Sequence, residues 1–88
     1  GIREVDFRRM EAEQGGVCAI CSRPETRPDR SGNPQRLSVD HCHETGQVRG
    51  LLCHSCNITL GVARDDPEHL RAMADYVERH RRPHVRAA

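Results

Sequence analysis

Residues 37–57 read LSVDHCHETGQVRGLLCHSCN, and this stretch decides the fold. It ends with a Cys-x-x-Cys pair, Cys53 and Cys56, and a second pair of the same spacing, Cys18 and Cys21, lies upstream. Thiolates at this spacing can chelate one metal ion from a tight turn, and two pairs supply the four sulfur ligands that Zn²⁺ prefers in structural sites. The sequence therefore predicts one structural zinc ion held by these four cysteines.

Disulfide bonds and redox chemistry are the alternative roles for these cysteines. The chain has five cysteines, so one would lack an internal partner, and no β-α-β pattern of the thioredoxin type surrounds Cys18. With 88 residues, 35% of them hydrophobic, one Phe, one Tyr and no Trp, the chain cannot fill a large core. Such a small domain needs a staple, which favours the metal.

The sequence shows neither a membrane anchor nor a secretory signal. No apolar run approaches the roughly 20 residues of a membrane span, and the N-terminus lacks a basic segment followed by an apolar one. We therefore expect a cytoplasmic protein with no membrane partner. A reducing compartment also favours zinc over disulfides.

Local patterns predict a small α+β domain over residues 1–88, with a core at about 7–78 and a basic tail at 79–88. Residues 3–14 have helical spacing and stop at Gly15, and residues 22–36 are rich in Pro and polar residues, as in an exposed loop. Residues 37–39 and 48–52 alternate like the two strands of a hairpin. We expect the zinc to clamp this hairpin.

Two further helices are expected after the hairpin. One covers Cys53 to about Gly61. The other is capped by Asp65 or Asp66 and has Pro67 in its first turn. Its apolar residues follow the i, i+3, i+4, i+7 pattern of a helix face, so we expect them to pack in the core: Leu70, Met73, Ala74 and Val77.

The hairpin and the helix after it carry candidate ligands for a second metal ion. At about 100° per residue, Asn57 lies roughly 40° around the helix from Cys53, so zinc would fix its direction. Asp40 ends the strand beside that helix, and a carboxylate with an amide oxygen suits Mg²⁺ or Mn²⁺. We predict a catalytic metal site at Asp40 and Asn57. A mixed zinc site within Asp40–His43 is the alternative.

His41 is the candidate general base, because an imidazole with an ordinary pKa near 6.5 can accept a proton from water at neutral pH. Adjacent strand residues point to opposite faces, so Asp40 and His41 can share a site only where the strand bends. The sequence therefore predicts a bend at this point.

Basic residues make DNA the expected partner. All 14 basic residues are Arg, and residues 79–88 hold four of them and no acid, although the net charge is only +1. Arginine binds phosphate oxygens through two hydrogen bonds. The candidate DNA contacts are Arg49, Arg79, Arg81 and Arg82. Alternatively, the C-terminal arginines and Arg49 are simply solvated and do not contact DNA. The sequence does not determine the oligomeric state, which could be a monomer.

The linked motifs resemble the recombination endonuclease VII branch of the HNH, or His-Me finger, nucleases, from about Phe7 to Tyr76. They are Cys18-Ala-Ile-Cys21, Val39-Asp40-His41-Cys42-His43-Glu44-Thr45-Gly46, Arg49-Gly50-Leu51-Leu52-Cys53 and Cys56-Asn57. The resemblance implies a ββα-metal fold, a four-cysteine zinc and one divalent metal ion. It assigns water activation to His41 and an auxiliary role near the scissile phosphate to His43.

The sequence thus favours a divalent-metal-dependent DNA endonuclease that nicks DNA or cleaves both strands. The family resemblance implies 5′-phosphate and 3′-hydroxyl products. The branch is common among phage-borne genes, which points to a bacterial host cell. A zinc module that binds nucleic acid without cutting it is the second interpretation, because the four cysteines alone would suffice for it. A zinc-stabilised protein-interaction domain is the third.

Overall fold

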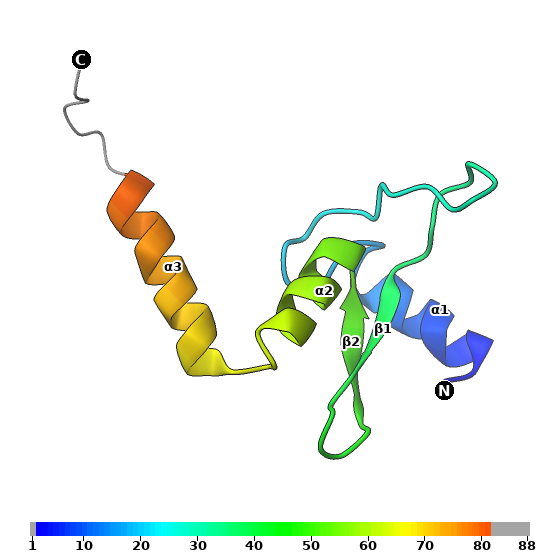
Figure 1. The fold of residues 1–88 in the computed structure, drawn as a ribbon. Helices are drawn as coiled ribbons and strands as arrows, with labels where there is room; N and C mark the ends of the chain where they lie inside the picture. The colour runs from blue at the N-terminus through cyan, green and yellow to red at the C-terminus, as the bar shows by residue number, and fades with distance from the viewer. Residues whose placement is uncertain (1, 82–88) are drawn as a thin grey trace.

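The computed structural model describes residues 2–81, which form a small α+β arrangement, as expected. The β1–β2 hairpin is antiparallel, α1 packs against β2, and α2 packs against β1. Figure 1 shows the hairpin between these helices, with α3 projecting away from them. The elements are α1 (Glu4–Glu13), β1 (Ser38–His41), β2 (Val48–Leu52), α2 (His54–Val62) and α3 (Pro67–Arg81).

The N-terminal helix ends where the sequence predicted. Gly15 and Gly16 have φ angles of 69° and 75°, and the backbone N–H of Gly16 donates to the Glu11 carbonyl at 2.8 Å. Only glycine adopts this left-handed conformation without steric cost, so the two glycines terminate α1. The chain then turns directly into the first cysteine pair.

The hairpin is irregular at the point where the sequence predicted a bend of the first strand, but the extra residue lies on the second strand, in a β-bulge. Asp40 pairs with Gly50, but His41 pairs with Val48, so the register shifts between Asp40 and His41. The skipped residue, Arg49, lies on β2. A bulge increases the local twist and redirects the side chains next to it. Asp40 is buried, whereas His41 is exposed.

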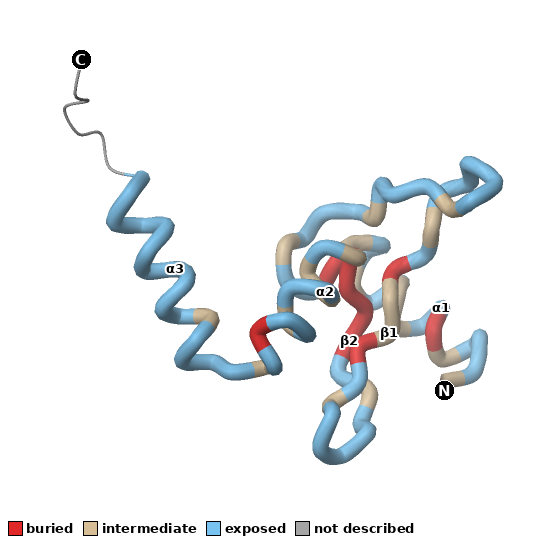
Figure 2. Tube along the Cα trace, viewed as in Figure 1, coloured by how far each residue is buried: buried red, intermediate tan, exposed pale blue. Residues whose placement is uncertain are grey.

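The core is small, as the composition predicted. Figure 2 shows the buried residues mainly in the hairpin and at the start of α2, with further buried positions on α1 and at the end of α2. Leu51 is fully buried at the centre of this cluster. Its other buried members are Phe7, Cys18, Leu37, Leu52 and Cys53. Two of the six are cysteines, so packing alone leaves little apolar area to stabilise the fold.

Gln14 fastens α1 to the outer edge of β2. Its amide N–H donates to the Leu51 carbonyl at 2.9 Å, and its amide oxygen accepts from the Leu51 N–H at 3.0 Å. A second amide hydrogen donates to the Val17 carbonyl at 2.8 Å. The side chain therefore satisfies backbone groups that no third strand pairs.

The α3 helix begins as predicted, but the expectation that its apolar face packs in the core is wrong. Asp66 caps the helix through the Glu68 N–H at 3.0 Å, and Pro67 is the first helical residue. However, Met73 is 46% and Val77 53% exposed, and α3 has no buried residue. Helical periodicity identifies an apolar face, but it does not identify what covers that face.

The projecting helix makes the domain elongated. Its radius of gyration is 16.4 Å, compared with about 12 Å for a compact chain of this length. Within residues 2–81, no helix combines the length and the apolar character that crossing a membrane requires.

Replacing Leu51 by Ala should lower the free energy of unfolding by roughly 2–5 kcal/mol, because it leaves a cavity in the core. Met73→Ala should change it by less than about 0.5 kcal/mol, because the side chain is largely exposed. Urea unfolding followed by circular dichroism measures both changes. A loss of similar size for the two variants would show that α3 packs against the domain in solution.

Candidate functional site

The four paired cysteines converge although they lie in two distant segments. One Sγ atom from each of Cys18, Cys21, Cys53 and Cys56 lies within 4.8 Å of the others. Cys53 is the N-cap of α2, and its sulfur accepts a hydrogen bond from the Cys56 N–H. Four sulfur donors at this separation match the tetrahedral shell of a structural zinc ion. The cluster can therefore hold the predicted zinc.

The electrostatics of the cluster also call for a cation. Burial raises the pKa of Cys56 to about 12, and the neighbouring cysteines add to the rise. Burial acts in the same direction on Cys18, but backbone N–H groups around its sulfur outweigh burial and lower the pKa to about 6. One thiolate is thus easily formed, whereas ionising the last of four side by side is costly. A bound Zn²⁺ would remove that cost.

Asp40 is held by an arginine fork. Arg49 Nε donates to Asp40 Oδ2 at 2.6 Å, and Arg49 Nη2 donates to Asp40 Oδ1 at 3.0 Å. The same Nη2 lies 3.3 Å from both carboxylate oxygens of Asp65. The hydrogen bonds to Asp40, followed by those to Asp65, raise the pKa of Arg49. A guanidinium therefore lies directly on the carboxylate that was predicted to bind a metal.

The other predicted ligand and the predicted base lie on α2 and β1, without a hydrogen bond to Asp40 in the described part of the chain. His41 is exposed at the end of β1, and Asn57 is half-buried in α2, where its N–H donates to the Cys53 carbonyl at 3.0 Å. The packing of α2 on β1 brings the two elements together. Within residues 2–81, the side-chain hydrogen bonds of Asp40 go to Arg49, and none joins it to His41 or Asn57.

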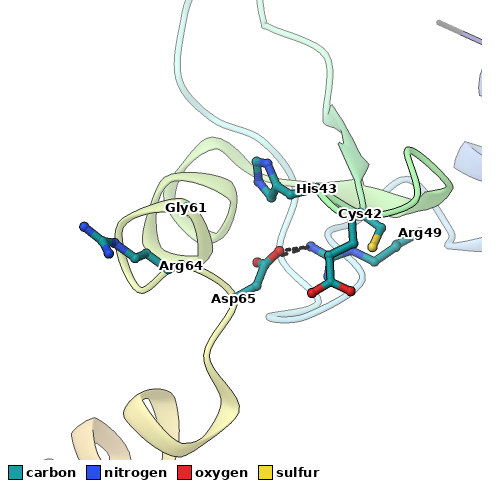
Figure 3. Close-up of a pocket in the computed structure, with 7 residues that line it drawn as sticks. Cys42, His43, Arg49, Gly61, Arg64 and Asp65 are labelled. Atoms are coloured by element: carbon teal, nitrogen blue, oxygen red, sulfur yellow. Dashed lines mark hydrogen bonds and ion pairs between the residues drawn. The ribbon is translucent and has the colours of Figure 1, made fainter.

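An open cleft of about 520 Å³ lies between the hairpin turn and the end of α2. Figure 3 shows His43 on one side of the cleft, Arg64 on the other, and the Arg49–Asp65 ion pair below them. The lining residues are Cys42, His43, Glu44, Arg49, Gly61, Arg64 and Asp65. Two arginines and two carboxylates thus share the lining, together with the imidazole of His43.

Arg64 and Asp65 were missed as site residues by the sequence interpretation, which treated Asp65 only as a helix cap. Their φ angles are 58° and 55°, a left-handed conformation that costs non-glycine residues free energy. This strained turn places both residues in the lining of the cleft and directs the Asp65 carboxylate to Arg49. Neither composition nor periodicity predicts such a turn. The cluster of charged residues before Pro67 is the one sequence feature that marks this segment.

Two of the three remaining predicted DNA contacts lie on α3, outside the cleft. Arg79 and Arg81 are exposed in the last turn of α3, and Arg79 stacks over Tyr76 at 5.8 Å from the ring centroid. Arg82 lies outside the described residues, as does most of the basic tail.

Comparison with known proteins identifies the class to which the chain belongs. Residues 1–79 match the model of the recombination endonuclease VII family. The chain belongs to this family, and membership indicates a nuclease. It is 45% identical over 78 residues to the Gene 59 protein of Mycobacterium phage L5 and 45% identical over 80 residues to that of Mycobacterium phage D29.

These alignments cover 88% and 90% of the chain but 44% and 45% of the phage proteins. The chain thus spans less than half the length of the curated relatives it matches.

The purified protein should contain one zinc ion per chain, and Cys56→Ser should remove both the zinc and the folded state, because the free energy of zinc binding is also free energy of folding. Cys42→Ser is the matched control, because the fifth cysteine lies outside the cluster. Atomic absorption and circular dichroism measure metal content and fold. A folded, zinc-free Cys56→Ser protein would refute the structural role.

Proposed function

We propose that the chain is a divalent-metal-dependent DNA endonuclease with a ββα-metal site of the HNH, or His-Me finger, type. The observation that carries this proposal is the continuous order β1, β2, α2, with the buried Asp40 carboxylate on β1 and Asn57 on α2. The bulge beside Asp40 and the family membership both support it.

Asp40 and Asn57 are the residues that would hold the divalent ion. The donor set fits a hard cation, because a carboxylate and an amide oxygen are typical ligands of Mg²⁺ and Mn²⁺. The buried Asp40 carboxylate already attracts a cationic group, the Arg49 guanidinium. When bound, the ion would supply electrostatic stabilisation of the charge that develops on the phosphate during cleavage.

His41 accepts the proton of the attacking water in this proposal. Its exposure at the end of β1 leaves the imidazole accessible to water and substrate. His43, which lines the cleft, lies where a phosphate group can enter and has the auxiliary role. Attack in line with the leaving 3′ oxygen would yield 5′-phosphate and 3′-hydroxyl ends.

The DNA backbone would be held by arginines. Arg64 lines the cleft and makes no ion pair within the described residues, so its guanidinium is available for phosphate. Arg49 would contact phosphate only after leaving Asp40. Arg79, Arg81 and Arg82 would extend the contact along the duplex, with an affinity that falls as salt rises.

A zinc module that binds nucleic acid without cleaving it is the second candidate. The Arg49 fork on Asp40 favours it, because a carboxylate fully engaged by arginine is not available to a metal ion. In that case, the cysteine cluster would maintain the fold and the arginines would bind the backbone, while His41 would have no chemical role.

Zinc-loaded protein should nick supercoiled plasmid when Mg²⁺ or Mn²⁺ is present. His41→Ala should lower the rate by about 10²- to 10⁴-fold, the usual contribution of a general base, and should leave zinc content and circular dichroism unchanged. His69→Ala is the matched control, because His69 is exposed on α3 and outside the cleft. Gel electrophoresis of the plasmid measures the rate.

Two results would contradict the nuclease proposal. If the plasmid stays intact with every metal ion while DNA is retarded on a gel, the protein is a binding module. If His41→Ala nicks as fast as His69→Ala, the base is a different residue.

A further inference from the structure

The Arg49 guanidinium is shared unequally between two carboxylates. It forms a bidentate pair with Asp40 through bonds of 2.6 Å and 3.0 Å, whereas Asp65 is reached by one nitrogen at 3.3 Å. Asp40 is thus the main partner and Asp65 the secondary one. The side chain of Asp40 is 11% exposed and that of Asp65 is 23% exposed, so water screens both pairs only partly.

The backbone conformation of the turn at the end of α2 determines where the Asp65 carboxylate lies. Arg64 and Asp65 are both left-handed, and the Asp65 N–H donates to the Leu60 carbonyl at 2.9 Å, which fixes the turn at the end of α2. Strain of this kind persists where the surrounding structure requires it, and it is common at functional sites. The turn places a second carboxylate beside Arg49 without contacting Asp40.

The charges of these three side chains favour the binding of a further cation. Asp40, Asp65 and Arg49 together carry one net negative charge. A divalent cation would compete with Arg49 for the oxygens of Asp40, because an arginine fork uses both of them. The arginine would lose its main partner but could keep Asp65, so its displacement costs less than expulsion into water.

We propose that Arg49 is a resident counter-ion of Asp40 that a divalent cation must displace, and that Asp65 is the positioning residue that retains the displaced guanidinium in the cleft. This inference rests on the proposed metal site at Asp40. Retention places the positive charge beside His43, in the cleft where the proposed substrate phosphate enters. Binding of the cation and exposure of the arginine to substrate are then one coupled event.

The test is the affinity of zinc-loaded protein for Mn²⁺, measured by the electron paramagnetic resonance signal of free Mn²⁺. Arg49→Gln should raise the affinity by about tenfold, the change expected when a charge-assisted hydrogen-bonded competitor is removed. Arg64→Gln is the matched control, because it removes the same charge from the same cleft without touching Asp40. Its effect should not exceed about threefold, as for a screened charge.

One further variant separates the fork from its charge, and two further measurements separate the effect on metal binding from loss of the fold. Arg49→Lys keeps the charge but loses the planar fork, and it should also bind Mn²⁺ more tightly than the unaltered protein. Zinc content and circular dichroism show that each variant is folded. Plasmid nicking should fall in Arg49→Gln although its metal affinity rises, a divergence that a merely structural role does not produce.

Asp65→Asn tests the positioning role. It should lower Mn²⁺ affinity by several-fold, because Arg49 then has only Asp40 as a partner, and most of this effect should vanish in the Arg49→Gln background. Asp65→Glu should restore part of the affinity. Asp66→Asn is the control, because it removes a neighbouring carboxylate that caps α3 and does not contact Arg49.

The outcomes distinguish this inference from the proposed function. If Asp40→Asn keeps full Mn²⁺ binding, the proposed metal site is wrong and the inference fails with it. If Asp40→Asn abolishes binding but Arg49→Gln matches Arg64→Gln, the metal site stands and the displacement by Mn²⁺ is refuted. If Asp65→Asn matches Asp66→Asn, the positioning role of Asp65 is refuted.

Discussion

The meeting of four sulfur atoms links two segments that are more than thirty residues apart, and the rest of the domain depends on this link. The buried cluster has six residues, two of which belong to the cysteine pairs, so apolar packing alone cannot hold the hairpin to the N-terminal segment. Cys53 also caps α2. The same cysteine pair therefore fixes where α2 starts, with the N-cap four residues before Asn57.

The helices, strands and turns of this fold could largely be predicted from local sequence patterns. Contacts between residues distant in the sequence could not be predicted in this way. Gly15, Pro67 and the strand patterns marked element boundaries within a residue or two, and the proposed roles of Asp40 and His41 predicted an irregularity at this point of the hairpin. The sequence could not reveal that Arg49 lies on Asp40 or that a strained turn brings in Asp65, because neither depends on spacing. It also misplaced the apolar face of α3, since periodicity says nothing about a partner.

The nearly neutral net charge conceals two different populations of arginine. On α1 both arginines are paired with acids, Arg8 with Glu4 and Arg9 with Asp6, and Arg3 just before the helix is also paired with Asp6. Arg64 in the cleft has no such partner within residues 2–81. Attraction for a polyanion is therefore greater at the cleft than at α1, although each holds two arginines. An unpaired charge contributes more to the local potential than a count of basic residues suggests.

The bonds from Gln14 to both backbone groups of Leu51 have a consequence for self-association. An open strand edge offers a row of donors and acceptors on which another chain can pair, and such pairing leads to aggregation. In β2 the outward N–H and C=O at Leu51 are occupied by one side chain, and the Ala19 N–H also reaches that carbonyl at 3.0 Å. A single glutamine thus seals the middle of a two-stranded sheet against intermolecular β-pairing.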